Sequence, residues 1–458
     1  MASTYINSPN GTGTDPQIAT FSMWFKITKP EATEVYLFSG GDGASNNSWL
    51  RVQGGTGQLY FRNRTSSSND CVIQTNAQYR DVNGWYHVVL KLNSTLSTAA
   101  DRATMYVNGE EITSFSSSTD MTQNNLFHMF GATITHIGKR VNDGSTGNLG
   151  GFLASHVHFC DGYAYDASAF GEYDANGVWK IKTSPSVTYG TRGFFILKDG
   201  NSVTDQSGNS NNFTVGGGTL TNTEDSPSNV FCVLNKLQKP YPAQSNTLGF
   251  GNTKYADNNA SWQRNYGTIG ATTGKWFYEF KNLQDNNNTG ECRIGWDSID
   301  FINDSSDNYY SGLTIDRAGK LRGGIKGVSG YSPNEVQMTA AYSGGDFTFT
   351  ANDILGMAID LDNETFSVYK NGNLEIDAYS YAGLSNNSIS KSRGYFIAPS
   401  INWYSSTGDV NRGCFNFGNG YFETTAVSSA GTNASGIGIF EYDVPTGYTA
   451  LSTKGLNL

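Results

Sequence analysis

Charged residues, patterned cysteines and long apolar runs are all scarce in this chain. Asp, Glu, Lys and Arg make up 15% of the 458 residues, and no apolar run approaches the length of a membrane span, which argues against membrane insertion. The cysteines contain no CxxC pair, which argues against a disulfide framework and a zinc module. We expect all of them to be buried as small hydrophobic side chains in a reducing cytosol: Cys71, Cys160, Cys232, Cys292 and Cys414.

Positive charge is also in short supply. The formal net charge is −10, and no basic stripe follows any segment. Because nucleic-acid binding depends on Lys and Arg neutralising phosphates, nucleic acid is an unsuitable partner. The first residues have neither the basic start nor the apolar stretch of a secretion signal, so we expect no such signal.

Glycine, asparagine, serine, threonine and aromatic residues are abundant, and these residues favour strands and tight turns. The segment around Phe21, Met23 and Phe25 places apolar side chains at every second position, which is the period of a strand. Asn108-Gly109 lies between two such segments and predicts a hairpin with a type I′ turn. The predicted class is therefore all-β.

Five pieces of the first third of the chain occur in a recognisable order. They are residues 21–25 (FSMWF), 84–89 (GWYHVV), 105–109 (MYVNG), 136–138 (HIG) and the strand around Phe152. In this order they resemble the laminin-G-like, concanavalin A-like jelly roll. The resemblance implies an antiparallel β-sandwich.

A second set of pieces, between about 245 and 420, resembles a SPRY domain, which is another two-sheet sandwich. The pieces are residues 274–280 (GKWFYEF), 293–296 (RIGW), 353–363 (DILGMAIDLDN), 366–372 (FSVYKNG), 394–400 (GYFIAPS) and 415–418 (FNFG). Independently of the resemblance, Leu355, Met357, Ile359 and Leu361 fall on one face of a strand. Asn371-Gly372 predicts a second hairpin.

These observations predict four segments: a jelly roll over 1–165, a β- and turn-rich connector over 166–240, a SPRY domain over 241–425 and a C-terminal segment over 426–458. The connector contains an Asp-x-Ser-Gly-Asn-x-Asn motif that begins at Asp205. Similar motifs often precede the first strand of laminin-G-like domains. We therefore expect residues 190–217 to fold back on the first domain.

The order of all segments, ending in Pro-x-Gly-Tyr-x-Ala-Leu-x-Thr from Pro445, resembles a group of virion proteins of tailed bacteriophages, especially of aquatic (cyanophage or marine) hosts. The resemblance implies assembly in the host cytoplasm and exposure on the particle surface, as a tail fibre, an appendage or a capsid decoration. It also implies other virion proteins as partners. A homo-oligomer is expected because virion appendages repeat.

Catalysis is not expected. Glucanases of concanavalin-type folds need paired carboxylates on one strand, in an E-x-D-x-E or E-x-D-x-x-E pattern. Glu172 and Asp174 form one partial match, and Glu441 and Asp443 form another. Neither match contains the final carboxylate, so we predict a protein that is not an enzyme.

Metal binding has weak candidates only. His156, His158 and Cys160 have the spacing of strand-borne zinc ligands, but no fourth ligand is evident. Hydrogen-bonded imidazoles are the simpler interpretation. The acidic run Asp360, Asp362 and Glu364 lacks the glycine and spacing of an EF-hand, so a structural hairpin is the better interpretation. We predict no cofactor, while calcium in a jelly-roll loop stays open.

Aromatic residues in polar loops are the candidate ligand-binding residues, because sugars stack their C–H faces on Trp and Tyr. Trp403 is the first choice. The further candidates are Tyr404, Tyr309, Tyr310 and Tyr331. Partial burial in the core is the alternative for each of them. The leading hypothesis is a virion surface protein that binds host-surface glycans. A purely architectural virion protein and a polysaccharide depolymerase are the alternatives.

Overall fold

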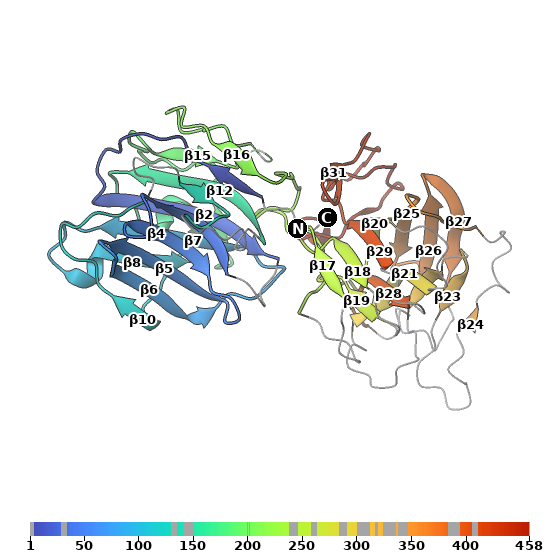
Figure 1. Ribbon diagram of the computed structural model, residues 1–458. Helices are drawn as coiled ribbons and strands as arrows, with labels where there is room; N and C mark the ends of the chain where they lie inside the picture. The colour runs from blue at the N-terminus through green and yellow to red at the C-terminus, as the bar shows by residue number, and fades with distance from the viewer. Residues whose placement is uncertain are drawn as a thin grey trace. The chain divides into compact units, whose positions relative to one another are not determined.

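The computed structural model describes residues 4–28, 34–129, 135–141, 151–198, 200, 202–237, 246–257, 263–283, 291–299, 312–316, 319–323, 336–337, 347–382, 394–404 and 411–457. The chain divides into two compact units, formed by Met1–Asn222 with Ser226–Ser228 and by Thr223–Asp225 with Asn229–Leu458. Both consist of β-sheets, which confirms the predicted all-β class and its two sandwiches (Figure 1). Within the described residues, no helix is long and apolar enough to cross a membrane.

The sandwich of the first unit has two sheets in the described part of the chain. The sheet that we call the β4 sheet has the order β10 (Phe115–Thr119), β6 (Ser68–Gln78), β5 (Gln58–Thr65), β4 (Asn47–Val52), β3 (Val35–Gly41), β11 (His136–Ile137), β1 (Tyr5–Asn7) and β16 (Thr214–Gly217). The β2 sheet has the order β15 (Phe194–Ile196), β12 (Phe152–Asp161), β2 (Ile18–Ile27), β7 (Tyr86–Asn93), β8 (Ala103–Val107) and β9 (Glu110–Glu111). The 3-10 helix η1 (Ala99–Arg102) precedes β8.

The core of this sandwich follows the predicted alternation. Phe21, Met23 and Phe25 on β2 are fully buried and belong to one cluster with the inward side chains of the β4 sheet. The predicted hairpin is confirmed, because Asn108 and Gly109 join β8 to β9 with φ of 50° and 87°. The five cysteines are buried, as expected, and none of them forms a disulfide.

Residues 166–222 belong to the first unit. They contain η2 (Ala167–Ala169) and the hairpin of β13 (Gly171–Tyr173) and β14 (Trp179–Ile181). Farther along, β15 pairs with β12 and β16 pairs with β1, so residues 194–217 supply a strand to each sheet (Figure 1). The Asp205 carboxylate accepts hydrogen bonds from the backbone N–H groups of Phe195, Ser207 and Asn211. The Ser-Gly-Asn motif therefore holds β15 in place.

The second unit is a sandwich of the same kind. Its β20 sheet has the order β17 (Thr247–Gly249), β18 (Lys254–Asp257), β29 (Asn411–Asn416), β20 (Lys275–Asn282), β25 (Ile354–Asp360), β26 (Thr365–Lys370) and β27 (Asn373–Ser380), with β32 (Thr449–Ala450) beside β20. Its β21 sheet has the order β19 (Gln263–Tyr266), β28 (Ile397–Tyr404), β21 (Glu291–Ser298), β22 (Leu313–Asp316), β23 (Leu321–Gly323) and β24 (Val336–Gln337).

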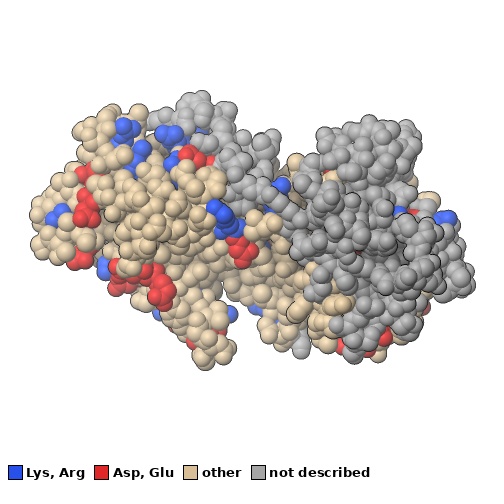
Figure 2. Space-filling view, turned by 90° about the horizontal axis from the view of Figure 1, so that it is seen from below, with Lys and Arg blue, Asp and Glu red and all other residues tan. Residues whose placement is uncertain are grey.

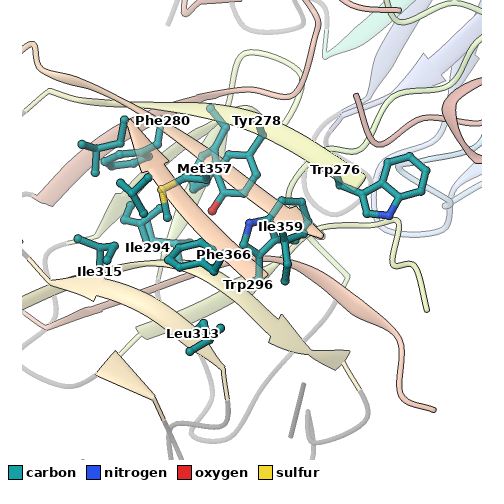
Figure 3. Packing of buried hydrophobic residues seen from close by; sticks show 14 of the residues in the cluster. Trp276, Tyr278, Phe280, Ile294, Trp296, Leu313, Ile315, Met357, Ile359 and Phe366 are labelled. Carbon is teal, nitrogen blue, oxygen red and sulfur yellow. The ribbon is translucent and has the colours of Figure 1, made fainter. Parts of the chain in front are cut away.

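Side chains from β20, β21, β22, β25 and β26 meet in the core between these sheets (Figure 3). Leu355, Met357 and Ile359 on β25, with Leu361 just beyond its end, all belong to that core, as the alternation predicted. Asn371 and Gly372 have φ of 50° and 81° between β26 and β27, which confirms the second hairpin.

The C-terminal segment covers the outer face of the β20 sheet. It contains β31 (Thr425–Ala426), which pairs with β30 (Tyr421–Phe422), and η6 (Gly455–Asn457). Phe440, Val444 and Ala450 pack on Phe277 and Ala358, whose side chains point away from the main core. The segment is thus part of the second unit.

A buried carboxylate holds this segment on the sheet. Glu279 on β20 is fully buried and accepts hydrogen bonds from Asn416 Nδ2 and from the backbone N–H groups of Glu441 and Tyr442, each at 2.9 Å. Burial raises the pKa of Glu279 to about 7, against the lowering effect of these donors. The Glu279 carboxyl group therefore gains or loses its proton near neutral pH.

The attachment of the C-terminal segment should weaken as pH rises. The folded state holds a proton on Glu279 up to about pH 7, whereas the unfolded chain releases it near pH 4.5. The resulting stabilisation is complete below pH 4.5 and is lost as pH rises through 7, with a size of about 3 kcal/mol. Hydrogen exchange of peptides from 436–452, corrected for intrinsic rates, should show protection that falls over this window. In Glu279→Gln protection should be independent of pH, and an unchanged pH profile in that variant would contradict the assignment.

Candidate functional site

The structure removes Trp403 from the set of exposed aromatic residues. Trp403 lies on β28 rather than in a polar loop, is 1% exposed and stacks against Tyr255 with ring centres 6.3 Å apart. The prediction of a loop position is wrong because its polar neighbours, among them Asn402, point to the opposite face of the strand. Trp403 therefore offers no ring face to a sugar.

The other predicted aromatic residues cannot be placed in a site. The backbone of Tyr404 ends β28, and its side chain lies outside the described part of the chain. Tyr309, Tyr310 and Tyr331 also lie outside the described residues. Their predicted role in ligand binding stays a prediction.

The candidate metal ligands on β12 have other partners. A β-bulge separates Ser155 from His158, and His156 at the bulge has φ of 47°. His156 Nδ1 lies 2.8 Å from Ser155 Oγ, while His158 Nδ1 lies 3.0 Å from the Tyr189 hydroxyl. Cys160 packs in a separate apolar cluster, where burial raises the pKa of its thiol. No group of three His, Cys, Asp or Glu side chains in the described ranges could hold a metal ion.

The carboxylates of the partial glucanase motifs stabilise turns. Asp174 accepts hydrogen bonds at 2.9 Å from two backbone N–H groups of its own turn. Asp443 accepts the backbone N–H and the hydroxyl of Thr432, and Glu441 accepts the backbone N–H of Ser428. These side chains therefore have a local structural role.

The acidic run at Asp360 also stabilises a turn. Asp360 accepts hydrogen bonds from the backbone of Asp362 and from Asn363, and it pairs with Lys275 at 3.0 Å. Burial alone would raise the pKa of Asp360, but these partners outweigh it and lower the pKa. The arrangement is that of a hairpin cap, in agreement with the structural interpretation.

The outer face of the β2 sheet is closed by the β13–β14 hairpin. Trp179 Nε1 donates to His87 Nδ1 at 3.0 Å, so the proton of the neutral imidazole lies on Nε2 and points to Ser22 Oγ at 2.8 Å. Trp24 stacks on the other side of His87, with ring centres 4.8 Å apart. A Cβ on Gly171 would lie 2.4 Å from the Trp179 ring, so glycine is required there. The hairpin therefore covers His87 on this face.

The outer face of the β4 sheet is built differently. Its strands point alternate side chains away from the core. Their register aligns Tyr36, Arg51 and Tyr60 in one row across β3, β4 and β5, and it aligns Trp49 with Arg62 in the next row. We call this surface the arginine–aromatic face, and it comprises Tyr36, Trp49, Arg51, Tyr60, Arg62 and Arg64.

Guanidinium groups lie over the rings of this face. The Arg51 Cζ atom is 4.5 Å from the ring centre of Trp49, 5.0 Å from that of Tyr60 and 5.7 Å from that of Tyr36. Arg62 Cζ is also 4.5 Å from the ring centre of Trp49. Trp49 is therefore only 3% exposed, whereas Tyr60 and Arg62 are partly exposed. Cation–π contacts of this kind order both partners.

The positive charge of this face is only partly compensated. Arg51 forms an ion pair with Glu34. Arg62 donates from Nη2 to Asn47 Oδ1 at 2.6 Å, and Arg64 donates to two backbone carbonyl groups. Among the described residues neither Arg62 nor Arg64 has an ion-pair partner. On the side of the molecule drawn in Figure 2, most of the surface of the described residues is neither acidic nor basic, and Lys and Arg make up only 30 of the 458 residues.

This face is not among the predicted sites, although the sequence contains a signal for it. Residues 49–51 (WLR) and 60–64 (YFRNR) have aromatic or basic side chains at every second position, with Leu50, Phe61 and Asn63 between them, which is the pattern of a strand whose two faces differ. Which strands lie side by side, and so which rings and guanidinium groups meet, follows from the pairing of β3, β4 and β5.

Comparisons with known proteins found one family match and several solved structures. Residues 1–151 match the family Laminin_G_3, described as the concanavalin A-like lectin/glucanases superfamily. No curated protein matches the sequence. The human HERC1 SPRY domain is 20% identical and has a TM-score of 0.25, with 38% of this chain and 94% of that chain covered. A heptameric SAP-like pentraxin from Limulus polyphemus is 14% identical and has a TM-score of 0.29, with 47% and 90% covered. The Ruminococcus gnavus IT-sialidase CBM40 is 13% identical and has a TM-score of 0.25, with 36% and 94% covered.

The closed face of the β2 sheet should make the first unit sensitive to acid. Burial, with a smaller contribution from His156, lowers the pKa of His87 to about 3, whereas the unfolded chain takes up this proton near pH 6.5. The stabilisation is complete above pH 6.5 and is lost as pH falls toward 3. In urea unfolding between pH 4.5 and 7, His87→Gln should reduce the slope of stability against pH by about 1.4 kcal/mol per pH unit. An equal slope in both proteins would contradict this assignment.

Proposed function

We propose that this protein is a non-enzymatic carbohydrate-binding protein that holds its ligand on the arginine–aromatic face. The proposal rests on one observation: Tyr60, Arg62 and Arg64 lie partly exposed and side by side on a strand of a lectin-like sheet. Sugars offer apolar C–H surfaces to an aromatic ring and hydroxyl oxygens to guanidinium N–H donors. Side chains on a paired strand are held more rigidly than side chains on a loop. The match of residues 1–151 to a lectin and glucanase superfamily supports the proposal.

The non-enzymatic part of the proposal has separate support. Cleavage of a glycosidic bond needs a pair of carboxyl groups that face the sugar. The carboxylates of both partial motifs, at Asp174 and Asp443, accept hydrogen bonds within their own turns. The six residues that define the arginine–aromatic face include no carboxylate, and Glu34, which contacts the face, pairs with Arg51. Binding without hydrolysis is the function that this chemistry favours, and a depolymerase is disfavoured.

We further propose that the protein acts on the surface of a bacteriophage particle, where it contacts host-surface glycans beside other virion proteins. The order of the laminin-G-like, Ser-Gly-Asn, SPRY and C-terminal segments supports this placement by resemblance. A purely architectural role is the alternative, and glycan binding separates the two.

Truncation of the partly exposed tyrosine should weaken glycan binding. In Tyr60→Ala the stacking surface is lost, so affinity for the glycans bound by the full-length wild type on an array should fall by about tenfold. Tyr163→Ala removes an exposed tyrosine, 39% exposed, from the segment that follows β12 and should bind as the wild type does. Equal binding by Tyr60→Ala and wild type would place the ligand elsewhere, and release of reducing sugar from the bound glycans would overturn the non-enzymatic proposal.

Localisation on intact particles tests the virion proposal. Immunogold labelling of particles from infected cells should place the protein at the tail or on the capsid surface. Label at the tail tip or fibres is expected for a primary role in host recognition, whereas label across the capsid lattice is expected for a decoration protein. Particles that carry no label would contradict the virion proposal and leave the carbohydrate-binding proposal to stand by itself.

A further inference from the structure

We infer that the ligand of the arginine–aromatic face is an acidic polysaccharide, whose sugars carry carboxylate or sulfate groups. This inference rests on the proposed carbohydrate-binding function and adds the chemical class of the ligand. It comes from the charge balance of the face and from the hydrogen bonds that its guanidinium groups make.

The arginine–aromatic face brings positively charged side chains together in a chain whose net charge is negative. Arg51, Arg62 and Arg64 bring three positive charges to two neighbouring strands, and the Arg140 guanidinium lies 5.9 Å from the ring centre of Tyr36 on the same face. Glu34 compensates the charge of Arg51. Elsewhere the chain carries an excess of acidic residues, with a net charge of −10. A surplus of acidic side chains was thus available, yet the described residues place none beside Arg62 or Arg64.

Keeping these groups together has a cost in free energy. Burial, followed by repulsion from Arg64 and Arg140, lowers the pKa of Arg62 to about 10. Charges that are partly removed from water repel one another more strongly than charges in bulk solvent. A bound anion would reverse this repulsion, so the face should prefer an acidic ligand to a neutral ligand of the same shape.

The guanidinium groups are also oriented before a ligand binds. Arg62 is held by Asn47 and by the Trp49 ring, and Arg64 is held by the carbonyl groups of Ala44 and Ser67. The two residues are two apart on β5 and point to the same face, with Cα atoms about 7 Å apart. Ordered guanidinium forks bind carboxylate and sulfate oxygens through paired N–H groups at little further entropic cost.

Calorimetric titration of the full-length protein tests the inference with four polymers. They are alginate, which carries carboxylates, dextran sulfate, uncharged dextran, and polyacrylate, which is a polyanion without sugar. The wild type should bind alginate or dextran sulfate at least about tenfold more tightly than dextran and polyacrylate, and more weakly as salt rises. Arg62→Gln and Arg64→Gln should each weaken that binding about tenfold at an unchanged melting temperature.

Two further variants test the need for a guanidinium group and the position of the site. Arg62→Lys keeps the charge and loses the fork, so it should bind with intermediate affinity. Arg412→Gln removes an exposed arginine from β29 of the second unit and should bind as the wild type does.

Each other outcome has a definite meaning. Equal affinity for dextran and the acidic polymers, or full binding by both Arg62→Gln and Arg64→Gln, would overturn the acidic-ligand inference and leave carbohydrate binding intact. Binding of polyacrylate as tight as that of alginate would keep an anion site and overturn the carbohydrate proposal. No binding of any polymer would overturn both.

Discussion

The side chains of a β-strand point alternately to opposite faces, so a sheet that fills a core with one face has a second face outside the core. The side chains of that outer face are covered by other segments, form hydrogen bonds with one another or are exposed to solvent. The two units solve this problem with segments outside their main sheets. In the first unit, Trp179 on the β13–β14 hairpin closes the β2 sheet over His87. In the second unit, the C-terminal segment closes the β20 sheet over Phe277 and Glu279. The arginine–aromatic face is built in a third way, because its own guanidinium groups lie over its rings.

The two closures differ in chemistry and therefore in their response to protons. His87 stacks on Trp24, accepts a hydrogen bond from Trp179 and is neutral because burial disfavours its charged form. Glu279 receives three N–H donors, yet burial dominates and keeps its pKa high. Neutral His87 therefore stabilises the folded state at higher pH, and protonated Glu279 stabilises it at lower pH. The arginine–aromatic face differs again, since its guanidinium groups stay charged and, among the described residues, only Arg51 of its three arginines has an ion-pair partner.

Positions of core side chains and hairpins were predictable because they depend on local pattern. Phe21, Met23 and Phe25 were assigned to one buried face by their spacing, and Asn108-Gly109 was assigned to a turn by its need for positive φ. The same local logic failed for Trp403. Polar neighbours in sequence suggested a loop, whereas on a strand those neighbours point to the opposite face and say nothing about the exposure of the indole.

The sequence by itself determined the all-β class, the alternation that fills both cores and the turns that join strands, because these follow from residues within one or two positions of each other. Only the tertiary structure decided which faces are closed and which gathers the arginine and aromatic side chains. Trp179 meets His87 across 92 positions, and Tyr36 meets Arg51 and Tyr60 through the register of three strands. Such contacts depend on which strands become neighbours, and that choice is made by the packing of the whole sandwich rather than by any local segment.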